Sequence, residues 1–269
     1  MPTIELARLK VETAQLAVRF SQPEAYVQGV VHLLQHYSMP VHRQGRIRGL
    51  RFVLMSYEVP PPLMKHLQFE MALQAEDSPE PALLIADGLW AERSIETRQL
   101  AVRLLGAIDS QPAEIMARLE MWAKENQEPI LVPELEHEGT RTLAAKYPDQ
   151  LVEFAKQLLG TKDALKQGLA LGALQSLLID TRYSNLPLIF DLLAGAIEAA
   201  ERHLRPNFAE LLSLLARRSP QETEYFLQQC LSAGAKVGRA NQGTAWIARQ
   251  AMKALPEDSR VRLHRSIEA

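Results

Sequence analysis

The chain has 269 residues, of which 47% are apolar and 23% charged, and its formal net charge is −2. This balance is typical of a folded protein with a sizeable core, and it excludes a chain that binds nucleic acid through net charge alone. The single cysteine, Cys230, excludes an internal disulfide and lies in an apolar helical pattern that predicts a buried side chain. No apolar run approaches the ~20 residues of a membrane span, so we expect a cytoplasmic protein with no membrane partner.

Helical periodicity runs along the whole chain, and prolines mark the start of many helices. The first two helices are expected over 3–20 and from Ser21 to about Tyr37, followed by an arginine-rich stretch at 42–51. After Pro60, Pro61 and Pro62 we expect helices near 62–75, 79–91, 94–107, 112–126, 134–146, 149–159, 162–179, 185–200, 206–217, 220–233 and 241–254, with a short tail after Pro256. Because no alternating run is bounded by Asn-Gly or Asp-Gly, we predict eleven to fourteen helices and no sheet.

Short helices joined by short loops pack as antiparallel neighbours, and a pair of them here spans roughly 30–40 residues, the period of HEAT-like repeats. We therefore predict an all-α fold, a HEAT-like α-α superhelix built as a solenoid of antiparallel helix pairs, forming a single domain over residues 1–269. A compact bundle of the same helices is the alternative. Six side chains on apolar stripes are expected to be buried: Trp90, Leu104, Leu105, Leu214, Phe226 and Trp246.

Two groups of basic residues are candidates for binding DNA. The first contains Arg43, Arg46, Arg48 and Arg51, which lie close together with no acid among them. The second contains Arg217, Arg218, Arg239 and Arg249, in a basic C-terminal third that follows an acidic segment at 110–165. Arginine suits phosphate because its planar fork can bond two oxygens, and in a curved stack of helix pairs both groups would line one concave surface. The alternative for both is a solvated or ion-paired helix face.

Other patterns point away from enzyme chemistry. The run Glu134-Leu-Glu136-His137-Glu138 has no second histidine at metal-ligand spacing, so we interpret it as a charged helix start and predict no metal site. Trp90, Trp122 and Trp246 each lie among apolar residues, which favours core packing over stacking on a base. The sequence contains no P-loop, dinucleotide fingerprint or nucleophile elbow, so no cofactor is expected.

Residues 85–107 contain the pattern Leu-Trp90, Glu96-Thr-Arg98 and Ala101, which resembles a helix pair of the bacterial DNA alkylation repair family, the D-type alkylpurine glycosylases. Looser similarities run through Met39-Pro40, His137-Glu138-Gly139, Arg217-Arg218-Ser-Pro220 and Trp246 to Lys253. The resemblance implies a concave superhelix of HEAT-like repeats that holds duplex DNA.

The family's active-site residues do not carry over to this sequence. Pro133 occupies the position that best matches the family's essential aspartate, and Leu165-Lys166-Gln167-Gly168 stands where the family has a tryptophan followed by paired arginines. A glycosylase of this kind needs a carboxylate near the sugar and aromatic faces against the cationic lesion. We therefore expect no catalytic residues. Three functions stay open: a duplex DNA-binding relative without excision activity, an α-solenoid scaffold for a protein partner, and an active alkylpurine DNA glycosylase with displaced residues, in which Trp122 with Glu125 or Glu134 would substitute.

Overall fold

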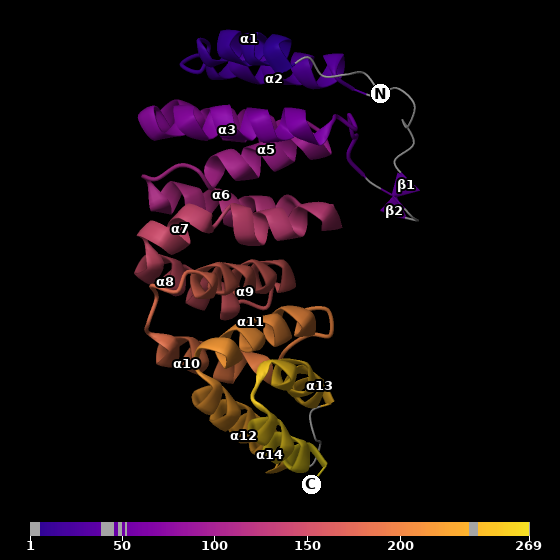
Figure 1. Cartoon of the computed structure of the whole chain (residues 1–269), viewed down its shortest axis with the longest axis vertical. Coiled ribbons are helices and arrows are strands. Elements are labelled where there is room, and N and C mark those ends of the chain that lie inside the picture. The colour runs from indigo at the N-terminus through magenta and orange to yellow at the C-terminus, as the bar shows by residue number, and fades with distance from the viewer. Residues whose placement is uncertain (1–5, 39–45, 48–49, 52, 237–241, 269) are drawn as a thin grey trace. The chain divides into compact units, whose positions relative to one another are not determined.

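The computed structural model describes residues 6–38, 46–47, 50–51, 53–236 and 242–268, and its regular structure is almost entirely helical (Figure 1). The helices divide into two compact units, an N-terminal unit of residues 1–146 and a C-terminal unit of residues 147–269. The expectation that the whole chain is one domain remains a prediction. In the described ranges, no helix has both the length and the apolar character needed to cross a bilayer.

The N-terminal unit stacks its helices in two rows. Its helices are α1 (Leu6–Ala17), α2 (Pro23–His36), α3 (Pro61–Asp77), α4 (Pro79–Ala91), α5 (Ile95–Leu105), α6 (Pro112–Glu125) and α7 (Arg141–Lys146), with short turns η2 (Pro129–Leu131) and η3 (Glu134–Glu138). Helix α3 packs between α1 and α5, whereas α2 packs on α4, and α4 pairs closely with α5. Each helix therefore buries its apolar stripe against the next helix of its row and against its own partner.

The C-terminal unit repeats this arrangement. Its helices are α8 (Pro148–Leu159), α9 (Ala164–Ile179), α10 (Leu186–Ile197), α11 (Arg205–Arg218), α12 (Pro220–Lys236), α13 (Gln242–Ala251) and α14 (Glu257–Glu268), with the short turn η4 (Met252–Ala254). Helix α11 packs between α9 and α13, α8 pairs with α9, and α12 lies against α10 and α14 (Figure 1). The all-α class with HEAT-like stacked helix pairs is confirmed, and the 14 α-helices of the described residues fall within the predicted range.

Proline positions account for most of the helix starts. Proline lies in the first turn of α2, α3, α4, α6, α8, α10 and α11, where its fixed φ suits the helix and its missing N–H is not needed. Helices α5 and α9 begin instead at side-chain caps, because Ser94 and Asp163 accept backbone N–H bonds from their first turns.

Three of the predicted elements were wrong in detail. The prediction of no sheet fails, because β1 (Arg46–Ile47) and β2 (Leu50–Arg51) form a two-residue antiparallel pair. The sequence places only two residues, one of them a glycine, between these strands, which is the spacing of a tight hairpin. The helix predicted over 134–146 is divided into the π-turn η3 and the short helix α7. The tail after Pro256 is the helix α14, which has Glu257 and Asp258 in its first turn.

The core is as predicted except at two positions. Trp90, Leu104, Leu105 and Phe226 are buried, and so is Cys230, whose burial raises the pKa of its thiol to about 11. Leu214 is only partly buried. Trp246 is 38% exposed, because α13 is the last helix of the row formed by α9, α11 and α13 and packs on α11 with one face.

The tightest backbone contact in the N-terminal unit lies where α5 ends against the π-turn. A Cβ added at Gly106 would lie 1.9 Å from the carbonyl oxygen of Glu138, and the hydroxyl of Thr142 donates to the carbonyl of Gly106 at 2.5 Å. A Cβ added at Gly139 would likewise lie 2.5 Å from Leu119. The wider π-turn and these two glycines together let the chain pass close under α5.

We expect Gly106→Ala to lower the free energy of unfolding by about 1–3 kcal/mol, because backbone atoms must move to admit the methyl group. The matched control is Gly195→Ala in the exposed last turn of α10, where a Cβ would meet nothing within 4 Å. That variant should gain roughly 0.5–1 kcal/mol from higher helix propensity. Urea denaturation measures both, and equal stabilities for the two variants would contradict the close approach.

Candidate nucleic-acid interface

The N-terminal basic cluster lies partly outside the described residues. Arg43 and Arg48 fall outside them, whereas Arg46 and Arg51 are Cα partners in the hairpin of β1 and β2. No helix was predicted over this arginine-rich stretch, and the structure has a hairpin there. The hairpin pairs Arg46 with Arg51, so the two residues are neighbours although they are five positions apart.

The segment that follows the hairpin is held between two buried carboxylates. Glu128 is 1% exposed, and one oxygen of its carboxylate accepts the backbone N–H groups of Val53 at 2.5 Å and Leu54 at 2.6 Å. Glu96 is 6% exposed and accepts the Ser56 hydroxyl at 2.7 Å and the backbone N–H of Glu58 at 2.8 Å. These bonds replace water for a backbone segment that has no helix of its own.

The same segment is tied to α5 through its backbone. The N–H of Met55 donates to the carbonyl of Arg93 at 3.1 Å, and the N–H of Ile95 donates to the carbonyl of Met55 at 2.9 Å. Glu58 has a left-handed backbone, with φ of 51°, where the chain turns away. The base of the arginine hairpin is therefore fixed to the start of α5 and to the loop after α6. Nothing local in the sequence distinguishes Glu128, because an acid in an acidic segment carries no sign that it is buried.

Trp90 and Trp122 stack on each other, and both faces of the Trp90 ring are covered. Their ring centroids lie 4.6 Å apart with an interplanar angle of 7°, and Trp122 is fully buried. The Arg98 guanidinium covers the other face of Trp90, with Cζ 4.5 Å from the ring centroid, and its Nε donates to the Trp90 carbonyl at 3.1 Å. The indole N–H of Trp90 donates to the Glu125 carboxylate at 3.1 Å. The prediction of core packing is confirmed for both tryptophans.

Around the position of the family's essential aspartate, the described residues do not place an unpaired carboxylate beside an exposed aromatic ring. Pro133 is exposed between η2 and η3. Glu134 accepts both the Nε of Arg103 at 2.9 Å and one of its terminal nitrogens at 3.1 Å, and this fork raises the pKa of Arg103. Within the described part of the chain, no three His, Cys, Asp or Glu side chains come together as a metal site.

The adjacent C-terminal arginines Arg217 and Arg218 have different environments. Arg218 directs its guanidinium at the turn after α9, where it donates to the carbonyls of Leu178 and Asp180 at 3.4 Å, Thr181 at 3.2 Å, and Tyr183. Its neighbour Arg217 is exposed. Arg218 therefore closes the end of α9, and only Arg217 presents its charge to solvent.

Helix α13 and the turn η4 that follows it carry an exposed stripe with one aromatic ring and two cations. Trp246, Arg249 and Lys253 recur at spacings of three and four, and all are exposed. Lys253 donates to Gln250 at 2.6 Å, and Arg249 makes no hydrogen bond or ion pair among the described residues. Arg239, the remaining predicted DNA contact, lies outside the described residues. An indole flanked by cations is a surface that can contact sugar or base while the cations contact phosphate.

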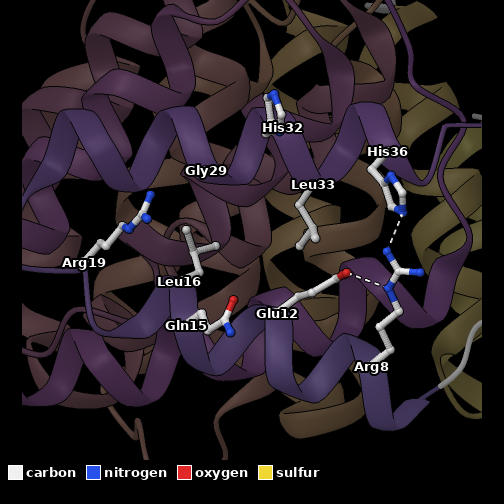
Figure 2. Close-up of a pocket in the computed structure, with 9 residues that line it drawn as sticks. All are labelled: Arg8, Glu12, Gln15, Leu16, Arg19, Gly29, His32, Leu33 and His36. Atoms are coloured by element: carbon white, nitrogen blue, oxygen red, sulfur yellow. Dashed lines mark hydrogen bonds and ion pairs between the residues drawn. The ribbon is translucent and has the colours of Figure 1, made fainter.

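A separate groove between α1 and α2 is held by its own charges (Figure 2). At one end Arg8 donates to Glu12 at 2.8 Å and contacts Nε2 of His36 at 3.3 Å, while Arg19 lies at the other end. Leu16 forms part of the floor, and a Cβ at Gly29 would lie 2.4 Å from its Cδ1, so the helices are in close contact there. Arg8 and Glu12 pair within α1, and hydrogen bonds to His36 and from the Tyr37 hydroxyl to Glu12 at 3.0 Å link them to α2 and its end, so we interpret the groove as a helix-pairing feature.

A sequence model of the family described as "DNA alkylation repair enzyme" matches residues 63–255. The chain belongs to the DNA alkylation repair enzyme family. Searches of curated proteins and of solved structures find no match. The family match spans α3 to η4, and so includes the tryptophan stack, Arg217, Arg218 and the whole of α13, but not the hairpin of β1 and β2.

The two neighbouring arginines provide a direct test of these assignments. We expect Arg218→Ala to lower the free energy of unfolding by about 1–3 kcal/mol, because it leaves several carbonyls of the α9 turn without their charged donor. Arg217→Ala removes the same charge from an exposed position and should change stability by less than about 0.5 kcal/mol. Chemical denaturation of the two variants separates the cases, and a stable Arg218→Ala protein would show that its carbonyl contacts are dispensable.

Proposed function

We propose that this member of the DNA alkylation repair enzyme family binds duplex DNA and does not excise alkylated purines. The observation that carries the proposal is the exposed stripe of α13, where Trp246 lies beside Arg249 inside the matched region. A large indole 38% exposed on a helix, next to an arginine without a partner among the described residues, presents an apolar ring and a positive charge side by side to solvent. Contact with a polyanion that also presents apolar sugar faces accounts for both residues.

The charges beside this stripe support the same ligand. Helix α11 packs on α13, and Arg217 near its C-terminus adds an exposed cation. Phosphate contacts do not require a net positive protein, because local cations displace the counterions condensed on DNA. Arg43, Arg46, Arg48, Arg51 and Arg239 remain proposed contacts, and a single concave surface shared by the N-terminal and C-terminal groups remains a prediction. Arg218 is the member least suited to binding, since its donors face carbonyls.

The residues at and near the position of the family's aspartate do not provide the carboxylate that base excision needs. Pro133 carries no carboxylate, Glu134 is neutralised by Arg103, and Glu125 is bonded to the edge of Trp90. Both faces of Trp90 are covered and Trp122 is fully buried, so neither ring offers an open face to a flipped base. A binding protein is the function that these contacts support.

A protein scaffold is the second candidate, and one surface favours it. Phe69 and Leu73 lie four positions apart on α3 and are 60% and 44% exposed. Residues at this spacing share a helix face, so they form a small apolar patch that a partner helix could cover. A protein that shows no salt-dependent binding to duplex DNA would support this alternative.

The first functional prediction concerns binding. Wild-type protein should bind duplex DNA with an affinity that falls as salt rises, measured by fluorescence anisotropy at two salt concentrations. Arg249→Ala should reduce the salt slope by about 1, and Trp246→Ala should weaken binding roughly tenfold. Tyr225→Ala is the control, because Tyr225 is 63% exposed in the same unit on α12. Equal losses for Tyr225→Ala and Trp246→Ala would remove α13 from the proposed surface.

The second functional prediction concerns excision. Purified protein incubated with duplex DNA containing 3-methyladenine or 7-methylguanine should release no base above the uncatalysed rate, because no free carboxylate stands near an open aromatic face. Released bases are measured by chromatography with a known glycosylase as the positive control. Excision that disappears in Glu125→Gln would instead identify an active enzyme with a displaced carboxylate.

A further inference from the structure

The first turns of α11 and α13 meet in the C-terminal unit, and an arginine lies between them. Arg205 is the first residue of α11 and Gly243 is the second residue of α13. A Cβ added at Gly243 would lie 2.8 Å from Nε, Cζ and one terminal nitrogen of Arg205. The guanidinium therefore lies directly against the start of α13. Since α11 also packs on η4 at the far end of α13, the two helices run in the same direction and their N-terminal ends are side by side.

This arrangement concentrates positive charge. Each helix N-terminus carries about half a positive charge from the aligned peptide dipoles, and Arg205 adds a full one. Neither α11 nor α13 has an acid in its first turn, whereas α12 has Glu222 and α14 has Glu257 and Asp258 in theirs. Within the described residues, Arg205 has no ion-pair partner. An arginine at the first position of a helix is unfavourable unless an anion compensates it.

Two donors at this place also lack acceptors. The Nε of Arg205 is buried and has no hydrogen-bond partner. Thr244, in the first turn of α13, is 2% exposed, and its hydroxyl has no partner either. Buried donors without acceptors are rare, because each one left unsatisfied costs about 1–3 kcal/mol. Two of them beside converging helix N-termini indicate an acceptor supplied from outside the chain.

We propose that Arg205 and the first turns of α11 and α13 bind a phosphate group, and that the ligand is a backbone phosphate of the DNA. The second half of this statement rests on the proposed DNA-binding function. A phosphate supplies a negative charge for the two helix dipoles and several acceptor oxygens for a guanidinium. The position also fits that function, because Trp246 and Arg249 follow Gly243 on the same helix. Gly243 is required at this place since any side chain would displace the guanidinium.

Two variants test the phosphate site by different routes. Arg205→Gln removes the charge, whereas Gly243→Ala keeps it and moves the guanidinium away, because the methyl group meets only the flexible end of that side chain. Both should weaken duplex binding by roughly 5- to 10-fold at low salt and make the salt slope shallower by about 1. The control is Arg202→Gln, which removes an exposed arginine three positions earlier and should leave a smaller change. Melting temperatures establish that the variants are folded.

Inorganic phosphate provides a readout that does not depend on DNA. At several times its dissociation constant, phosphate should raise the melting temperature of the wild-type protein by roughly 2–4 °C over chloride at equal ionic strength. The rise should be absent in Arg205→Gln and in Gly243→Ala. A wild-type protein that responds to phosphate but does not bind DNA would refute the proposed function and keep the phosphate site. Duplex binding and phosphate response that are both unchanged in the two variants would overturn the site and leave the DNA-binding function standing.

Discussion

A helix of ten to seventeen residues cannot bury its apolar stripe by itself, and this constraint organises the chain. Each helix depends on the next helix of its row and on its own partner, as α11 depends on α9, α12 and α13. A row built in this way has an end, and the last helix keeps a face without a neighbour. Helix α13 occupies that position, which explains why a tryptophan in an apolar sequence context is exposed there. The same geometry brings the starts of parallel helices together, and so places Arg205 against Gly243.

Several charged side chains in this protein form hydrogen bonds with backbone N–H and C=O groups of irregular segments, which have no partners within a helix. Glu128 and Glu96 accept N–H groups from the segment after the hairpin, while Arg218 donates to carbonyls of the turn after α9. In each case a full charge replaces the water that an irregular segment would otherwise need. A count of basic residues along the sequence therefore overstates the charge available to a ligand. Contacts decide which of two adjacent arginines is structural and which faces solvent.

The sequence predicted the elements with regular signals and missed those that depend on distant contacts. Proline at helix starts and 3.6-residue periodicity located nearly every helix, and the resemblance at 85–107 indicated the family that the match over 63–255 establishes. The division of the helix at 134–146 depends on Gly106 lying under the carbonyl of Glu138, a contact between segments some thirty residues apart. No local pattern reveals such a contact. The same holds for the meeting of Arg205 with Gly243, while the hairpin was missed because its strands have only two residues each.

The three tryptophans divide between two environments, and this gives the protein a built-in optical contrast. Trp90 and Trp122 are stacked in the interior of the N-terminal unit, whereas Trp246 is exposed on the C-terminal unit. A collisional quencher such as iodide reaches only exposed rings, so the quenchable part of the emission reports on α13 alone. The unquenched part reports on the stack and on the loop after α6, where Glu128 holds the base of the hairpin. Emission spectra with and without the quencher therefore distinguish an event at the C-terminal helix from a rearrangement in the N-terminal unit, without any covalent label.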